Sequence, residues 1–188
     1  MVFAMDSLVG LDVQIATWLQ GSGTPGLTAF LLVVSLLHTH PVVLGIALAL
    51  AFVFHGRGEA YWVRVTVLAI PCGLALNALL KEVVRRPRPV YEFPLVTLDT
   101  FSFPSGHTAA ATLLYGVLGA YLVQHARRRG ARAAIAAGAA ALIALVGFSR
   151  MYLGAHYLTD VVAAAALSLL WVAACLWFAR GLHAPRPH

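Results

Sequence analysis

The stretch FPSGHTAA, residues 103–110, places a proline, a hydroxyl, a glycine and an imidazole at the start of an apolar block that continues to about residue 125. This block is long enough to cross a hydrocarbon core, which needs roughly 20 residues of helix. Pro104 and Ser105 suit the first turn of a helix, where backbone N–H groups have no partner within the helix. We therefore expect a transmembrane helix over 105–125 with a functional polar beginning.

The composition of the whole chain indicates an integral membrane protein. The chain has 188 residues, of which 61% are hydrophobic and 11% charged, so most of its surface must face something other than water. A backbone that faces lipid must satisfy its own hydrogen bonds, which favours helices over open strands. We expect an all-α fold, a polytopic transmembrane bundle of five to six helices, in a single domain over residues 1–188.

Apolar blocks of nearly transmembrane length divide the chain. They lie at about 61–80, 105–125, 132–149 and 155–179, with a shorter one at about 40–55. The transmembrane core is therefore expected over 40–179. Residues 1–38 are expected to form an interfacial helix over about 3–20 and a half-spanning helix over 26–37. Five full spans are the first choice and six the alternative.

The basic residues predict the orientation of the bundle. Helix parity places eight of them on one side, which the positive-inside rule makes the cytoplasm: Arg57, Arg64, Arg127, Arg128, Arg129, Arg132, Arg180 and Arg186. Loop charge then explains the net charge of +6 without nucleic acid. No Lys or Arg precedes Arg57, so the basic region of a signal peptide is missing and no cleavage is expected.

The remaining basic residues face outward, the side on which positive charge is disfavoured during insertion. These residues are Lys81, Arg85, Arg86, Arg88 and Arg150. They belong to two of three polar groups, which are KEVVRRPRP at 81–89, PSGH at 104–107 and SRMYLGAHYLTD at 149–160. Helix parity brings all three groups to the outer end of the bundle, where they can form one site.

Five residues of these groups suit a bound phosphate. Lys81, Arg88 and Arg150 supply three cations, two of them guanidiniums whose planar forks match phosphate oxygens. Ser105 lies at a helix start, where unpaired N–H groups and the helix dipole favour an anion. Gly106 has no side chain to block the approach of the phosphate to those groups.

The same groups contain a possible nucleophile. His156 and Asp160 are four residues apart, so on a helix the carboxylate would orient the imidazole and leave its other nitrogen as a lone pair. His107 could then protonate a leaving oxygen as general acid. Taken singly, such features have ordinary explanations, because arginines such as Arg85 and Arg86 often bind lipid headgroups. Their coincidence at one membrane face favours a catalytic site.

In these residues the chain resembles the type 2 phosphatidic acid phosphatase superfamily. Its three-part signature is matched by Lys81 with Arg88-Pro89 after six residues, by Pro104-Ser105-Gly106-His107, and by Ser149-Arg150 followed by His156 and Asp160. The resemblance implies a metal-independent lipid phosphatase without cofactors. It implies that His156 forms a phosphohistidine, Asp160 orients it and His107 is the acid, and that the phosphate is held by Lys81, Arg88, Ser105, Gly106 and Arg150.

The expected function is therefore removal of the terminal phosphate from a membrane lipid phosphate or diphosphate. Candidate substrates are a polyprenyl diphosphate, phosphatidylglycerophosphate and phosphatidic acid. Alternatives are a lipid-linked phosphotransferase and a non-catalytic lipid-phosphate binding or transport protein. The related vanadium-dependent haloperoxidases are soluble, which this composition argues against.

The expected location is a bacterial inner membrane, with the site facing the periplasm and a lipid phosphate and the bilayer as partners. Cys72 and Cys175 lie inside apolar blocks without metal-type spacing, so both are expected to be small core residues. A metal site is not expected.

Overall fold

The computed structural model describes residues 2–21, 23–90, 95–96 and 98–181, so Arg186 lies outside the described part. Within these ranges the chain forms helices without strands, and the longest connection between helices runs from residue 85 to residue 105. The helices are α1 (Val2–Gly21), α2 (Pro25–Leu37), α3 (His40–Gly56), α4 (Ala60–Val84), α5 (Gly106–His125), α6 (Arg129–Tyr152) and α7 (Leu158–Gly181). The expected all-α transmembrane bundle is confirmed.

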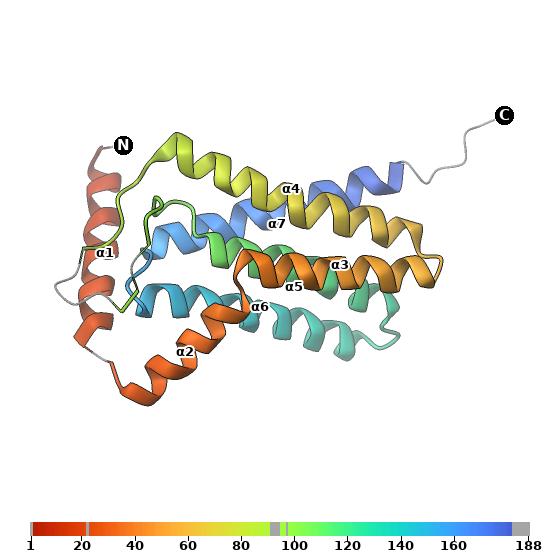
Figure 1. Ribbon diagram of the computed structural model, residues 1–188, viewed down its shortest axis with the longest axis horizontal. Coiled ribbons are helices and arrows are strands. Elements are labelled where there is room, and N and C mark those ends of the chain that lie inside the picture. Colours follow the sequence, from red (N-terminus) through yellow and green to blue (C-terminus); the bar gives the residue numbers. More distant parts are fainter. Residues whose placement is uncertain (1, 22, 91–94, 97, 182–188) are drawn as a thin grey trace.

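Helix α5 lies at the centre of the bundle, because α3, α4, α6 and α7 all pack against it (Figure 1). The first turns of α5 are rich in small residues, and Ala109, Ala110 and Ala111 are fully buried. Small side chains let neighbouring helices approach closely, which is how helices associate where lipid is the solvent. This packing holds the polar beginning of α5 in a defined place.

Four helices, α4 to α7, are long and apolar enough to cross a membrane. Helices α2 and α3 meet that test only together, and they are bent by 51° at the break between them. The pair raises the possible number of spans to five, the first choice from the sequence. The fifth span was expected over 40–55 alone, but α3 has only 17 residues and needs α2 to complete it.

Helix α1 lies across one end of the bundle, at a steep angle to the other helices (Figure 1). Its Leu19 packs in a small cluster with Leu31, Tyr152 and Leu153. Its Asp12 is only 2% exposed. Helix α1 is therefore docked on the protein through a buried carboxylate as well as through apolar contacts.

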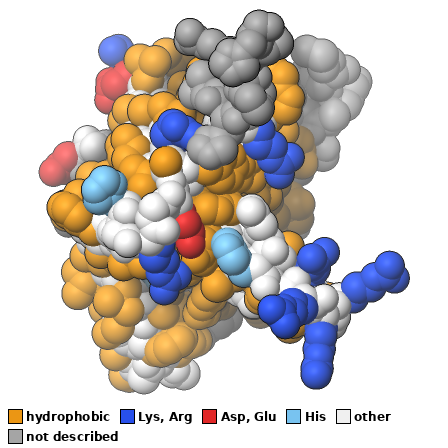
Figure 2. All heavy atoms as spheres, turned by 90° about the vertical axis from the view of Figure 1, so that its right-hand side faces the viewer, with side chains coloured by type: hydrophobic (Ala, Val, Ile, Leu, Met, Phe, Trp, Pro, Cys, Tyr) orange, Lys and Arg blue, Asp and Glu red, His pale blue; other side chains and the backbone are white. Residues whose placement is uncertain are grey.

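The opposite end of the bundle contains the α3–α4 and α5–α6 connections and the end of α7 (Figure 1). Figure 2 faces this end and shows Lys and Arg side chains that project from it. Helix parity predicted that eight basic residues lie on one side of the membrane. Those of the eight that the structure describes lie together at this end of the bundle.

The two cysteines differ in their surroundings. Cys175 is buried in the main core, as expected, whereas Cys72 is exposed. The prediction for Cys72 was wrong because α4 lies at the edge of the bundle, where one face of the helix points outward.

Candidate active site

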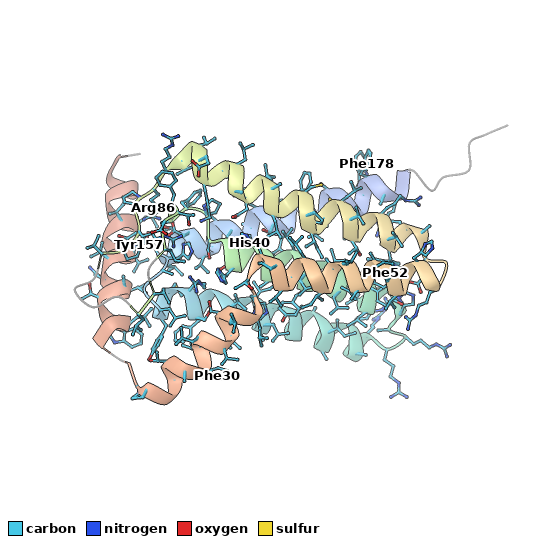
Figure 3. The ribbon with its side chains drawn as sticks, in the orientation of Figure 1. Phe30, His40, Phe52, Arg86, Tyr157 and Phe178 are labelled. Atoms are coloured by element: carbon cyan, nitrogen blue, oxygen red, sulfur yellow. The ribbon has the colours of Figure 1, made fainter. Side chains whose placement is uncertain are left out.

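The three polar groups meet at the end of the bundle that α1 crosses. Helices α4 and α6 end there, and α5 and α7 begin there (Figure 1). Figure 3 shows Arg86 and Tyr157 close together beside α1, although they come from separate connections. The connection 85–103 and the turn 153–157 thus bring residues distant in sequence into one cluster.

His156 lies in the turn between α6 and α7, so the expectation that it shares a helical face with Asp160 was wrong. Its Nδ1 is 3.7 Å from Oδ2 of Asp160, which belongs to the first turn of α7. Both residues are buried. Oδ2 also accepts hydrogen bonds from the Tyr157 N–H at 2.9 Å and the Ser102 hydroxyl at 2.5 Å, and these bonds hold the carboxylate towards the imidazole.

Arg88 contacts the other side of the His156 ring. Its Nη1 is 3.3 Å from Nε2 of His156 and donates to the Ala155 carbonyl at 2.7 Å. Its Nε donates to the Thr100 carbonyl at 2.6 Å. Because a guanidinium can only donate, this contact requires a lone pair on Nε2 and assigns the ring proton to Nδ1, which faces Asp160.

The surroundings of His156 keep its imidazole neutral. The pKa of His156 is lowered from 6.5 to about 4, mainly by burial and in addition by the positive charges of Arg88, Lys81 and Arg150, while the contact with Asp160 acts in the opposite direction. A buried imidazole disfavours its charged form, and nearby cations do the same. The nitrogen that faces Arg88 is therefore an available lone pair at neutral pH.

Two further cations complete the basic lining. Lys81 Nζ donates to the carbonyls of Phe101 at 3.0 Å and Ser102 at 3.4 Å. Arg150 is only 2% exposed and donates from Nη1 to the Ser35 hydroxyl, while its Nε has no partner among the described residues. Buried guanidinium groups are usually fully paired, so a free N–H here is available to an anion.

The beginning of α5 closes the site. Ser105 precedes the helix, and its hydroxyl accepts a hydrogen bond from Thr108 at 3.0 Å. At Gly106 a methyl group would lie 3.0 Å from Nε2 of His40, so a larger residue would press on that ring. His107 is half-buried and lies close enough to Arg150 and His156 to interact with them electrostatically. All eight predicted site residues thus lie in or next to one cluster.

Sequence reasoning missed an ion-pair network behind Asp160. Arg86 donates from Nη1 to Oδ1 of Asp160 at 2.6 Å and from Nη2 to Oδ2 of Asp12 at 2.8 Å. Asp12 also accepts the Thr159 N–H at 3.0 Å and the Thr159 hydroxyl. The ion pairs give Arg86 a role within the protein besides the lipid-headgroup contact considered for it, whereas Arg85 is exposed.

No sequence signal pairs Asp12 with Arg86, because 74 residues separate them and Asp12 lies outside the three polar groups. Ser102 was missed for a similar reason, since it precedes the PSGH group and contacts Asp160 across 58 residues. In the described part of the chain, no three His, Cys, Asp or Glu side chains are grouped so that they could hold a metal ion.

Comparison with known proteins identifies a family and related structures. The model of the PAP2 superfamily matches residues 60–183, which include all three polar groups. Phosphatidylglycerophosphatase B of Bacillus subtilis (strain 168) is 44% identical over 98 residues, which are 50% of this chain and 47% of that protein. The match therefore spans about half the length of this curated relative.

Two solved structures share the fold. The first is described as the first transmembrane PAP2 type phosphatidylglycerolphosphate phosphatase from Bacillus subtilis; it has a TM-score of 0.80 and 28% identity, over 97% of this chain and 90% of that one. The second is LpxE of Aquifex aeolicus, with a TM-score of 0.70 and 25% identity, over 89% and 95% of the two chains. The similarity extends to nearly the whole bundle.

Proposed function

Because the chain belongs to the PAP2 superfamily, we propose that it is a membrane phosphatase that removes the terminal phosphate of a lipid phosphate through a phosphohistidine. The observation that supports this most is the position of His156 between Asp160 and Arg88. One ring nitrogen is held towards a carboxylate, and the other carries a lone pair beside a phosphate-binding guanidinium. An imidazole in this arrangement is a nucleophile aimed at a bound phosphate.

In the first step, Nε2 of His156 attacks phosphorus while the bond to the lipid oxygen breaks. His107 gives its proton to that oxygen, so the lipid leaves as an alcohol from a phosphate monoester and as a lipid monophosphate from a diphosphate. The imidazole becomes positively charged when the P–N bond forms, and the carboxylate of Asp160 stabilises this charge. The three cations, Lys81, Arg88 and Arg150, and the N–H groups at the start of α5 neutralise the phosphoryl oxygens.

In the second step, water attacks phosphorus, the P–N bond breaks and inorganic phosphate is released. His107, neutral after the first step, accepts the proton of the attacking water, which restores both histidines to their starting states. Substrate candidates remain a polyprenyl diphosphate, phosphatidylglycerophosphate and phosphatidic acid. The proposed setting is a bacterial inner membrane with the site on the periplasmic side, which the basic residues at the opposite end support.

Phosphate release should not depend on a divalent metal ion. We expect purified protein in detergent to release phosphate from at least one of the three candidate lipids in EDTA, at the rate measured without the chelator. The reason is that the proposed charge stabilisation comes from side chains of this chain. Activity that is lost in EDTA and restored by a divalent ion would contradict the metal-free mechanism, and no release under any condition would contradict the phosphatase proposal.

The acidic limb of the pH profile should report on His156. With its pKa lowered to about 4, the imidazole stays neutral down to that pH, so the limb that His156 contributes to kcat/KM should lie near pH 4. Arg88 disfavours the imidazolium, so Arg88→Gln should raise the pKa and move the acidic limb to higher pH, besides reducing the rate. The measurement is kcat/KM from pH 3 to pH 8 for both proteins.

Substrate ionisation contributes a limb of its own near pH 6, but this limb is common to both proteins and cancels in their comparison. The exposed Arg85 provides the control, since Arg85→Gln should leave the limb in place. If the acidic limb of the kcat/KM profile stayed at the same pH in Arg88→Gln, the assignment of this limb to His156 would be contradicted.

A further inference from the structure

Two polar side chains outside the three polar groups lie beside the start of α5. A methyl group at Gly106 would be 3.0 Å from Nε2 of His40 and 3.7 Å from Oδ1 of Asn77. The His40 and His107 rings have centroids 6.4 Å apart. Figure 3 shows His40 at the break between α2 and α3, facing into the bundle. His40 and Asn77 thus both adjoin Gly106 of the proposed phosphate site, and His40 also lies beside the proposed general acid His107.

Asn77 is an unusual residue for the middle of a transmembrane helix. It is 6% exposed, and its Oδ1 has no hydrogen-bond partner among the described residues. A buried acceptor without a partner is rare in folded proteins, and beside a binding site the missing partner is expected to come from the ligand. Because intramembrane polar residues are costly, this amide indicates a functional contact.

The position of Asn77 indicates which part of the substrate it would meet. Asn77 lies one helical turn before Lys81, on the same face of α4 and deeper in the bundle. His156 approaches phosphorus from the turn between α6 and α7, and the leaving oxygen of an in-line displacement lies opposite the nucleophile. The remainder of a membrane lipid must also extend towards the bilayer. The leaving oxygen must lie beside the proposed acid His107, whose ring centroid is 6.4 Å from that of His40, and Asn77 lies with His40 next to Gly106 at the same helix start.

The chemistry of this pair favours a hydroxyl group. An amide oxygen can only accept a hydrogen bond, so its partner must be a donor such as an O–H. A second ionised phosphate, as in a diphosphate lipid, has no donor for this oxygen and would instead require cations. We therefore propose that Asn77 and His40 form a subsite that binds a hydroxyl of the leaving group, next to the ester carbon, and selects glycerol-type headgroups over diphosphates.

This inference rests on the proposed phosphatase activity, and the test separates the two. The substrates are phosphatidylglycerophosphate, which has a hydroxyl next to the ester carbon, and its analogue with a propanediol phosphate headgroup, which lacks it. A polyprenyl diphosphate is the third substrate. We expect kcat/KM to favour the glycerol headgroup by roughly tenfold over the analogue, the usual range for one hydrogen bond, and to be lowest for the diphosphate.

Asn77→Leu, which has nearly the same size, should reduce the glycerol-to-propanediol ratio to about one, and His40→Leu should lower it in the same direction. Thr66→Val is the control, because Thr66 is a buried polar residue of the same helix that bonds the Trp62 carbonyl. It should keep the parent ratio. If gel filtration shows that Asn77→Leu is aggregated, Asn77→Ala replaces it.

A ratio that stays at the parent value in the folded Asn77 variant would overturn the subsite. A parent protein that prefers the diphosphate, or treats both headgroups alike, would overturn it as well while leaving the phosphatase proposal intact. If the parent releases phosphate from none of the three lipids, the phosphatase proposal fails and the subsite fails with it.

Discussion

Replacing His156 by alanine is expected to lower kcat for phosphate release by about 10⁴-fold or more, the usual cost of removing a nucleophile. The variant should still bind the lipid phosphate, because Lys81, Arg88 and Arg150 remain in place. The measurement combines phosphate release in EDTA with equilibrium binding of a labelled lipid phosphate in detergent. Turnover at the parent rate would remove the nucleophile assignment, and loss of binding would show that His156 holds the phosphate.

The covalent intermediate provides an independent readout for the same variant. Rapid quenching during turnover of a substrate labelled in its terminal phosphate should leave label on the parent protein. A P–N bond survives alkali and breaks in acid, so the label should follow that pattern. His55→Ala is the control, because His55 lies in the last turn of α3, at the opposite end of the bundle. Label on His156→Ala would contradict the mechanism.

Replacing Arg86 by glutamine is expected to lower kcat by roughly 100-fold and to reduce thermal stability. Arg86 lies between two carboxylates, with Asp12 2% exposed and Asp160 fully buried. Removing the guanidinium leaves both negative charges without their partner, a change that costs about 3–5 kcal/mol at buried ion pairs. Asp160 would also lose the contact that fixes its Oδ1, so it would orient His156 less well.

Arg85→Gln is the matched control for this prediction. Arg85 is the neighbouring residue and has the same charge, but it is exposed, and its Nε donates to the Glu82 carbonyl at 2.9 Å. Activity and melting temperature of this variant should stay near the parent values. Equal losses in the two variants would indicate that the arginines act by binding lipid headgroups, and the ion-pair network would then have no catalytic role.

The bundle itself was largely predictable from the sequence. Transmembrane spans can be recognised in a sequence as long apolar blocks. Lipid cannot form hydrogen bonds with backbone polar groups, so a segment must be helical over its whole length to cross it. The blocks over 61–80, 105–125, 132–149 and 155–179 correspond to α4 to α7 with small shifts at their ends. The break between α2 and α3 was harder to interpret, since neither helix alone has the length of a span.

The placement of His156 shows the limit of spacing as evidence. A separation of four residues from Asp160 fits one turn of helix, yet α6 ends at Tyr152 and α7 begins only at Leu158. Between them, Gly154 takes a left-handed conformation with φ of 72°, which glycine adopts without strain. The contact between the two side chains therefore arises from a turn, with the carboxylate held by Ser102 and Tyr157.

The sequence by itself determined the class of the protein, the end of the bundle at which the three polar groups meet, and the residue types of these groups. These follow from local patterns, namely hydropathy, helix parity and short motifs, which do not depend on how the helices pack. Only the tertiary structure brought Asp12 to Arg86, Ser102 to Asp160, and His40 and Asn77 to Gly106. The members of each pair come from separate elements, so the contacts form only when the helices pack. The spacing of residues along the chain therefore does not predict them.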